Sequence, residues 1–455
     1  MVKLLNVNRS GENMKIVTPE VQIDNKTGFE PSIDIFERKE FGERLAKLIE
    51  NSESNPVIAL DAGWGQGKST FIKMWRGYLS HQREKKIQSV YFDAFENDYQ
   101  KDPFLALASE MYQLISNTDE EKQTQFKDKA IKAGKSLARG AIKLTVRTVT
   151  AGVIDGSAVD AVEKDLSNLI ADQVDDLVKE RFEHAQKDKL ALKAFKEHLS
   201  TFATEQGDGG PIVFIIDELD RCRPDFALEL LEQVKHLFSV KGITFILVTN
   251  RVQLEQSIKA KYGESNPVNY LHKFINVWLT LPRATDQYND HGYRYLQYVL
   301  REMSGENRNT NLRECENVLV EVVQYYQPSF REIERILSYF SILSNMLTKE
   351  QLNSEYQSVI AIVCYLKVCK PDSLRPVDGK ISYDRIVAAA NFTDIQQTEF
   401  CELDRVVRVV NFDFGDKATQ EKMIMDKEIS NYNLFGREPP NRLLIVNQWL
   451  TNISL

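Results

Sequence analysis

Short apolar runs recur through the first part of the chain, and each of them ends in polar residues. Four such runs lie within residues 57–70, 88–96, 211–221 and 243–250 and are rich in Val, Ile, Leu and Phe. Brief runs of this kind, without the long three-and-four spacing of a helix, are typical of strands that are covered on both faces of a parallel sheet. We therefore predict an α/β fold for this part of the chain.

The period of the pattern changes in the second part of the chain. Residues 290–303, 314–326 and 330–347 place apolar side chains three and four positions apart, as one face of a helix does. Pro328 precedes the last of these helices, near its first turn, where proline is tolerated. Residues 348–455 have mixed, mostly helical patterning and no motif that indicates chemistry. Partner recognition is the role expected for this last segment.

Residues 115–205 separate two of the apolar runs and are predicted to form helices. Four basic residues there recur at three- and four-residue steps and share one helical face: Lys132, Lys135, Arg139 and Lys143. This face suits contact with an anionic membrane surface or with nucleic-acid phosphates. A solvated face that pairs with acids elsewhere explains it as well, because no aromatic residue interleaves with the stripe. Residues 159–182 then show the near-heptad spacing of an amphipathic helix, which favours core packing.

Residues 57–70 carry the most specific chemical signal. They read Val-Ile-Ala-Leu-Asp-Ala-Gly-Trp-Gly-Gln-Gly-Lys-Ser-Thr, a strand followed by a glycine-rich turn. Glycine lets backbone amides surround phosphate oxygens, and the helix that follows adds its unpaired N-terminal amides. In this pattern Lys68 reaches the β- and γ-phosphates and the hydroxyl of Ser69 binds Mg²⁺. The nucleotide-binding residues predicted here are Gly63, Trp64, Gly65, Gln66, Gly67, Lys68, Ser69 and Thr70.

One position departs from the strict glycine-rich pattern. The pattern begins with glycine, whereas this chain has Ala62, a small residue that the turn tolerates.

Two acids follow the apolar run within residues 211–221. Asp217 is the first polar residue after the run, where it can hold the Mg²⁺ shell, and Glu218 follows it. Glu218 is the natural general base for a water molecule that attacks the γ-phosphate, so both acids and Lys68 are predicted to be catalytic. A surface carboxylate at a strand end is the alternative for Glu218.

The run at residues 243–250 also ends in polar residues. Thr249 or Asn250 can contact the γ-phosphate or the attacking water, although a strand-end amide is as often only a turn former. Guanine-specific sites usually read Asn-Lys-x-Asp at a strand end, and residues 250–253 lack the acid. ATP is therefore the predicted nucleotide.

Composition limits the remaining possibilities. The chain has 455 residues, enough for two or three domains, and a net charge of −8, which argues against a general polyanion binder. Its five cysteines are scattered and match no zinc pattern, as expected in a reducing cytosol. No stretch approaches the roughly 20 apolar residues of a membrane helix, and the N-terminus lacks a signal-peptide core. A cytoplasmic protein without a transmembrane segment, and without a metal other than Mg²⁺, is expected.

Taken together, several stretches resemble the KAP family of P-loop NTPases. They follow the family's order over roughly residues 31–345 and lie at 63–70, 91–95, 215–222, 271–283 and 328–335. The resemblance implies a P-loop core of the additional-strand type with a helical lid. It also implies that Arg331, in the Arg-x-x-x-Arg pattern of residues 331–335, faces the nucleotide.

The family usually reads Asp-Asp-Leu-Asp-Arg at the acidic strand end. Glu218 departs from this toward the ordinary catalytic glutamate, which favours hydrolysis. Many bacterial members of the family resemble components of defence against phages and plasmids.

These observations divide the chain into four segments. They are an N-terminal arm at 1–30, a P-loop NTPase domain at 31–285 with its helical insertion at 115–205, a helical lid at 286–347, and a mainly helical C-terminal domain at 348–455.

Three classes of function fit this organisation. A Mg²⁺-dependent ATPase that acts as a switch or remodelling engine for a protein partner or within a homo-oligomer comes first. An ATP-binding scaffold with little hydrolysis is the second class. The third is a P-loop phosphotransferase, for which Arg283, Arg331 and Arg335 would supply the second substrate pocket. In an oligomer, Arg221 or Arg223 could act on the nucleotide of a neighbouring subunit.

Overall fold

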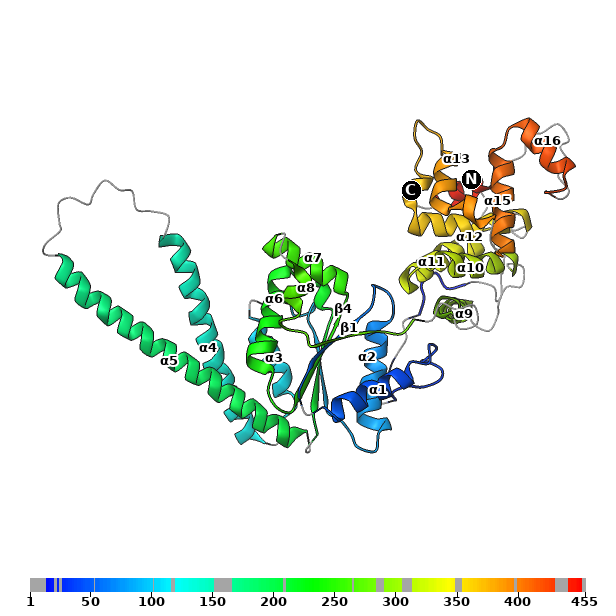
Figure 1. Cartoon of the computed structure of the whole chain (residues 1–455). Helices are drawn as coiled ribbons and strands as arrows, with labels where there is room; N and C mark the ends of the chain where they lie inside the picture. Colours follow the sequence, from blue (N-terminus) through cyan, green and yellow to red (C-terminus); the bar gives the residue numbers. More distant parts are fainter. Residues whose placement is uncertain are drawn as a thin grey trace, which may run out of the picture.

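Figure 1 shows the computed structural model of the chain. It describes residues 14–19, 23, 27–52, 54–100, 102–115, 119–150, 166–207, 210–263, 266–283, 290–304, 313–347, 354–396, 399–429 and 441–451. Within these ranges, the side chains of 138–150, 166–185 and 354–355 are outside the description.

Five parallel strands form one sheet in the order β2-β3-β4-β1-β5. Strand β4 lies between β1 and β3, so an additional strand separates the strand before the glycine-rich loop from the strand that ends in the two acids. The predicted α/β fold of the additional-strand type is confirmed. The strands are β1 Val57–Asp61, β2 Ser89–Asp93, β3 Ile212–Asp217, β4 Ile243–Thr249 and β5 Val277–Thr280.

Strand β5 was not predicted from the apolar pattern. It has four residues, lies at the edge of the sheet, and is only partly buried, so its sequence lacks the apolar run of a central strand.

Both faces of the sheet are covered by helices. Val57 and Ala59 of β1 pack into the hydrophobic core on one face, and Ile58 and Leu60 pack into the core on the other. The first core contains residues of α3 Pro103–Tyr112, α6 Pro224–Gln233, α7 Arg251–Tyr262 and α8 Pro267–Leu271. The second contains residues of α1 Lys39–Glu50 and α2 Lys68–Gly77. Parallel strands direct their carboxyl ends to one edge, and the candidate site lies there.

The insertion forms two long helices, α4 Glu120–Thr150 and α5 Leu166–Gln206, which project away from the sheet (Figure 1). Aromatic packing anchors their base, with the ring of Phe126 centred 5.3 Å from Phe202 and 6.1 Å from Phe195. In the predicted basic stripe, Lys132 and Lys135 are exposed. The side chains of the other two members, Arg139 and Lys143, lie outside the described residues.

The lid consists of α9 His291–Ser304, α10 Arg313–Tyr326 and α11 Phe330–Met346, close to the three predicted helices. The C-terminal helices follow, and one hydrophobic core joins the lid to α12, α15 and α17. The C-terminal helices are α12 Ser354–Cys369, α13 Tyr383–Ala390, α14 Phe392–Ile395, α15 Cys401–Phe414, α16 Lys417–Met425 and α17 Arg442–Thr451. Among the helices that the structure describes, none is both long and apolar enough to cross a membrane.

Part of the predicted N-terminal arm packs on the lid. The backbone N–H of Met14 donates to Oδ1 of Asn345 at 2.9 Å, and its carbonyl accepts hydrogen bonds from Ser341 and Asn345. The backbone N–H of Lys15 donates to the carbonyl of Met303 at 2.9 Å. These contacts tie residues 14 and 15 to α9 and α11.

Candidate nucleotide-binding site

The glycine-rich loop joins β1 to α2. Gly65 and Gly67 have φ angles of 70° and 75°, in the left-handed region that glycine adopts without the strain of a Cβ. Gly67 is the residue immediately before α2, and Lys68 and Ser69 begin the helix. The loop and the helix N-terminus therefore present backbone amides toward the same space, as a phosphate site requires.

Lys68 lies inside the curve of this loop. Its Nζ donates to the carbonyl of Ala62 at 2.6 Å and to the carbonyl of Gly63 at 3.2 Å. Burial lowers the pKa of Lys68, and the nearby carboxylates of Asp220 and Asp217 oppose that effect. The ammonium group is thus held at the loop, where it can contact a phosphate.

Asp217 ends β3 and is fully buried beside the start of α2. Its carboxylate accepts hydrogen bonds from the backbone N–H of Glu218 at 2.8 Å, from the hydroxyl of Tyr91 at 3.1 Å, and from the hydroxyl of Ser69. Burial raises the pKa of Asp217, while these hydrogen bonds lower it. The two predicted metal ligands, Ser69 and Asp217, are therefore adjacent. A carboxylate next to a hydroxyl is an oxygen donor set of the kind that Mg²⁺ prefers.

Glu218 has a left-handed backbone conformation, with a φ of 60°. Its carboxylate forms an ion pair with Arg221, and its side chain is only 16% exposed. Burial raises the pKa of Glu218, and the positive charges of Arg221 and Arg331 oppose this. A positive φ at a residue other than glycine is uncommon and concentrates at functional sites.

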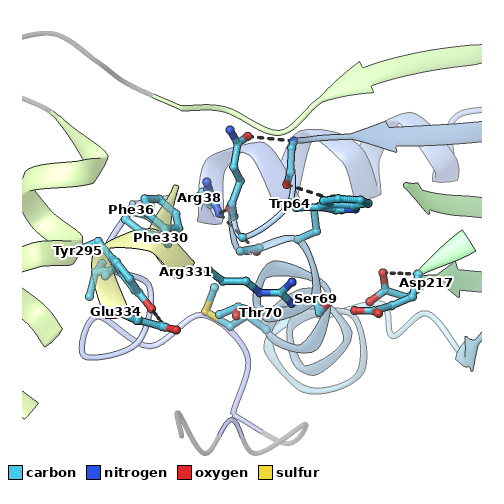
Figure 2. Close-up of a pocket in the computed structure, with 18 of the residues that line it drawn as sticks. Phe36, Arg38, Trp64, Ser69, Thr70, Asp217, Tyr295, Phe330, Arg331 and Glu334 are labelled. Atoms are coloured by element: carbon cyan, nitrogen blue, oxygen red, sulfur yellow. Dashed lines mark hydrogen bonds between the residues drawn. The ribbon is translucent and has the colours of Figure 1, made fainter. Parts of the chain in front are cut away.

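The lid contacts the loop directly. The backbone N–H of Phe330 donates to the carbonyl of Gly65 at 3.2 Å, and a Cβ at Gly65 would lie 3.0 Å from the side chain of Arg331. A capping box between Ser329 and Glu332 fixes the start of α11 at this contact. Figure 2 shows Arg331 reaching across the loop toward Ser69. The lid arginine and the loop therefore meet in one pocket.

This pocket has a charged end and an aromatic end (Figure 2). The charged end is formed by the loop, Asp217, Glu218 and Arg221. Ring centroids at the aromatic end are 4.7 Å apart for Phe36 and Phe330, and 4.5 Å apart for Tyr295 and Phe330. The other apolar and aromatic residues that line the pocket are Ile33, Ile35, Met74 and Tyr298.

Arg38 is a lining residue that the sequence analysis missed. It is buried, donates from Nη1 to the carbonyl of Gln66 at 3.2 Å, and donates from Nη2 to the carbonyl of Pro282 at 3.1 Å. Burial lowers the pKa of Arg38 to about 10. It links the loop to the segment after β5, and no motif around it signals this role.

Trp64 and Asp220 form a second link that was not predicted as a pair. The indole N–H of Trp64 donates to the carboxylate of Asp220. This bond ties the glycine-rich loop to the short turn after β3. The indole itself is 47% exposed.

Other predicted residues lie outside the residues that line the pocket. The amide oxygen of Asn250 caps α7, accepting from the backbone N–H of Val252 at 3.1 Å. Thr249 is buried at the end of β4, and its carbonyl accepts from the backbone N–H of Ala62 at 3.3 Å. Arg223 pairs with Asp98 at 3.1 Å.

The arginines considered for a phosphotransferase pocket do not converge. Arg283 donates to the carbonyl of Pro328 at 3.3 Å, at the connection into α11, and Arg335 is exposed. Of the three, only Arg331 lines the pocket.

Comparison with known proteins finds similar solved structures and one family model. No curated protein sequence matches the chain. A structure of the Aeropyrum pernix ORC2 protein described as ADPNP-ADP complexes is 14% identical, with a TM-score of 0.37, covering 98% of this chain and 91% of that one. The ADP form of the same protein is 13% identical, with a TM-score of 0.34 and 96% coverage of both chains.

The family comparison covers most of the chain. Residues 38–347, which include the loop, the acidic strand end and the lid, match the KAP family P-loop domain. The expected resemblance is confirmed, and the chain belongs to the KAP family of P-loop NTPases.

Proposed function

We propose that this protein is a Mg²⁺-dependent ATPase that acts as a switch or remodelling engine for a partner. The observation that supports the proposal is the meeting of Lys68, Asp217 and Glu218 with Arg331 at one end of a pocket whose other end is aromatic. The triphosphate of a nucleotide binds to cations and backbone amides, whereas its nucleobase packs against apolar surface. The pocket offers both over its length.

The residues divide the chemistry between them. Lys68 and the loop amides bind the phosphates, and Ser69 and Asp217 would hold Mg²⁺, which neutralises phosphate charge and orients the γ-phosphate. Glu218 accepts the proton of the attacking water, and Arg331 stabilises the charge that develops on the γ-phosphate. A contact between Asn250 and the γ-phosphate or the attacking water is also part of the proposal. The side chain of Asn250 caps α7, so it would have to form this contact in addition to the cap.

Coupling to a partner rests on how the lid is attached. Helix α11 contacts the loop through the bond between Phe330 and Gly65. The same helix shares a hydrophobic core with α12, α15 and α17. A change in the position of α11 between nucleotide states would therefore move the C-terminal helices as one body and present a different surface to the partner.

The first test measures steady-state phosphate release with ATP and Mg²⁺, comparing the wild type with Glu218→Gln. We expect turnover to vanish in the variant while ATP binding persists. Glu255→Gln, which removes a carboxylate from α7 outside the pocket, is the matched control and should turn over normally. Equal turnover in wild type and Glu218→Gln would remove Glu218 as the base.

The second test measures ATP affinity. Lys68→Ala removes the phosphate-binding ammonium, so we expect ATP binding to be lost. Lys73→Ala removes an exposed lysine from the same helix and is the matched control. Tight ATP binding by Lys68→Ala would defeat the phosphate-cradle assignment.

The ion pair between Glu218 and Arg221 favours a second candidate, an ATP-binding scaffold with little hydrolysis. In that case ATP binds to wild type and Glu218→Gln equally, and phosphate release is absent from both without a partner.

A cytoplasmic role in bacterial defence against phages or plasmids rests on family analogy alone. Phage plating on cells that express wild type or Lys68→Ala tests it, with protection expected only from the wild type.

A further inference from the structure

Glu334 places a carboxylate at the aromatic end of the pocket, where the guanidinium of Arg38 also lies, 4.7 Å from the ring centre of Phe36. Glu334 belongs to α11, lines the pocket and is half-buried. The hydroxyl of Tyr295, from α9, donates a hydrogen bond to Oε1 of Glu334 (Figure 2). A carboxylate among apolar side chains is costly unless it has a polar partner. This one has a partner for one oxygen and keeps acceptor capacity on the other.

The tyrosine fixes how the carboxylate is presented. Its ring is centred 4.5 Å from Phe330 and 6.1 Å from Phe36, so it is held within the aromatic cluster. Burial and the bond to Glu334 raise the pKa of Tyr295, which keeps its hydroxyl protonated and able to donate. Glu334 is therefore oriented by a rigid neighbour rather than by solvent.

This arrangement has a defined preference among nucleobases. The exocyclic N6 amine of adenine is a hydrogen-bond donor, whereas the corresponding O6 of guanine is an acceptor that a carboxylate repels. Guanine can bind a carboxylate through its paired N1 and N2 donors, but that geometry uses both carboxylate oxygens, so guanine competes with the hydroxyl of Tyr295 at Oε1 of Glu334. The single amine of adenine needs only one oxygen, and at Oε2 it does not compete with the hydroxyl of Tyr295.

We propose that Glu334, oriented by Tyr295, accepts a hydrogen bond from the N6 amine of adenine and makes this site prefer ATP to GTP. The inference rests on the proposed nucleotide function of the same pocket and adds the selection of the base. Glu334 is a specificity-determining residue, and Tyr295 is the residue that positions it.

The test measures dissociation constants of the 455-residue chain for ATP, GTP and purine riboside triphosphate in the presence of Mg²⁺. Purine riboside triphosphate keeps the purine ring and the phosphates but lacks the N6 amine. We expect the wild type to bind ATP about tenfold more tightly than either analogue, the effect of one hydrogen bond to a charged group. Equal affinity of the wild type for ATP and purine riboside triphosphate would overturn the proposal.

Two variants separate the base contact from general damage to the site. Glu334→Leu removes the acceptor at similar size, so we expect ATP affinity to fall about tenfold to the level of purine riboside triphosphate, whose own affinity stays unchanged. Tyr295→Phe removes the donor that competes with guanine at Oε1 of Glu334. The ratio of the dissociation constant for GTP to that for ATP should therefore fall. Glu302→Leu removes a glutamate from α9 outside the pocket lining and is the matched control.

The outcomes distinguish the two levels of the argument. Tight ATP binding and turnover with no discrimination between ATP and purine riboside triphosphate would overturn the base contact and leave the ATPase intact. A wild type that prefers GTP would also overturn it. Binding of none of the three triphosphates would refute the nucleotide function itself, and the base contact with it.

Discussion

The hydroxyl of Tyr91 donates a hydrogen bond of 3.1 Å to Oδ2 of Asp217, and the strands that hold the two residues are neighbours in the sheet. Tyr91 lies on β2 and Asp217 ends β3, so the sheet itself fixes the pair. Burial and the negative charge of Asp217 raise the pKa of Tyr91, which keeps the hydroxyl a donor. The carboxylate proposed to hold Mg²⁺ is therefore oriented by a residue outside the glycine-rich loop.

Tyr91→Phe removes this hydrogen bond while keeping the ring. We expect the Mg²⁺ concentration for half-maximal ATPase activity to rise about tenfold, because residues that orient metal ligands typically tune metal affinity by this much or more. Mn²⁺ binding, followed by electron paramagnetic resonance, should weaken in parallel. Tyr112→Phe removes a comparable bond, 3.1 Å to Gln123, far from the site and serves as control. Unchanged Mg²⁺ dependence would show that Tyr91 does not position Asp217.

Arg221→Gln releases Glu218 from its ion pair. The pair is partly exposed, so we estimate its strength at about 1 kcal/mol. If the pair holds the base away from water, its loss should raise the rate of phosphate release up to roughly fivefold. Single-turnover hydrolysis at saturating ATP measures this. A lower rate in Arg221→Gln would instead assign Arg221 a direct part in stabilising the transition state.

The pH dependence of turnover should report the environment of Glu218. Burial raises its pKa, and a general base acts only when ionised, so the turnover rate falls as the pH drops through that raised pKa. The fall should occur at higher pH than the value of about 4.3 that an exposed glutamate gives. Arg221 opposes the shift, so this acid limb should move to still higher pH in Arg221→Gln. An acid limb at the same pH in both proteins would contradict the proposed coupling.

A buried ion pair in the C-terminal helices provides a stability prediction. Arg442 donates to Asp413 from Nε at 2.9 Å and from Nη2 at 2.7 Å, and both side chains are almost fully buried. Arg442→Met leaves the carboxylate buried without its main partner, so the free energy of unfolding should fall by about 3–5 kcal/mol. The double variant Arg442→Met/Asp413→Leu should recover much of the loss. Urea unfolding measures both, and a double variant no more stable than Arg442→Met would contradict the assignment.

The residues that form the charged end could be predicted from the sequence because they lie in short segments. Eight consecutive residues, 63–70, specify the loop, since glycine adopts the positive φ angles of Gly65 and Gly67 without the strain of a Cβ. A continuous apolar strand ending in Asp217 and Glu218 is equally local. Both motifs also follow parallel strands, whose carboxyl ends share an edge, so their meeting was predictable in outline.

The orienting contacts could not be read in the same way. Tyr91 and Asp217 are 126 positions apart, and Trp64 and Asp220 are 156 apart. Only the strand order brings these pairs together. Strand β5 escaped prediction because an edge strand of four partly buried residues lacks an apolar run. Asn250 has a predicted position at a strand end, yet the helix that starts there uses its side chain as a cap.

The sequence by itself determined that the chain has a glycine-rich loop after a strand, an acidic strand end and helices after the sheet, because backbone conformation and strand burial are set by neighbouring residues. The tertiary structure alone decided that the lid rests on Gly65, that Arg38 braces the loop, and that Tyr295 orients Glu334 at the aromatic end. These contacts join elements distant in sequence, so they depend on how the helices dock on the sheet, which no local pattern encodes.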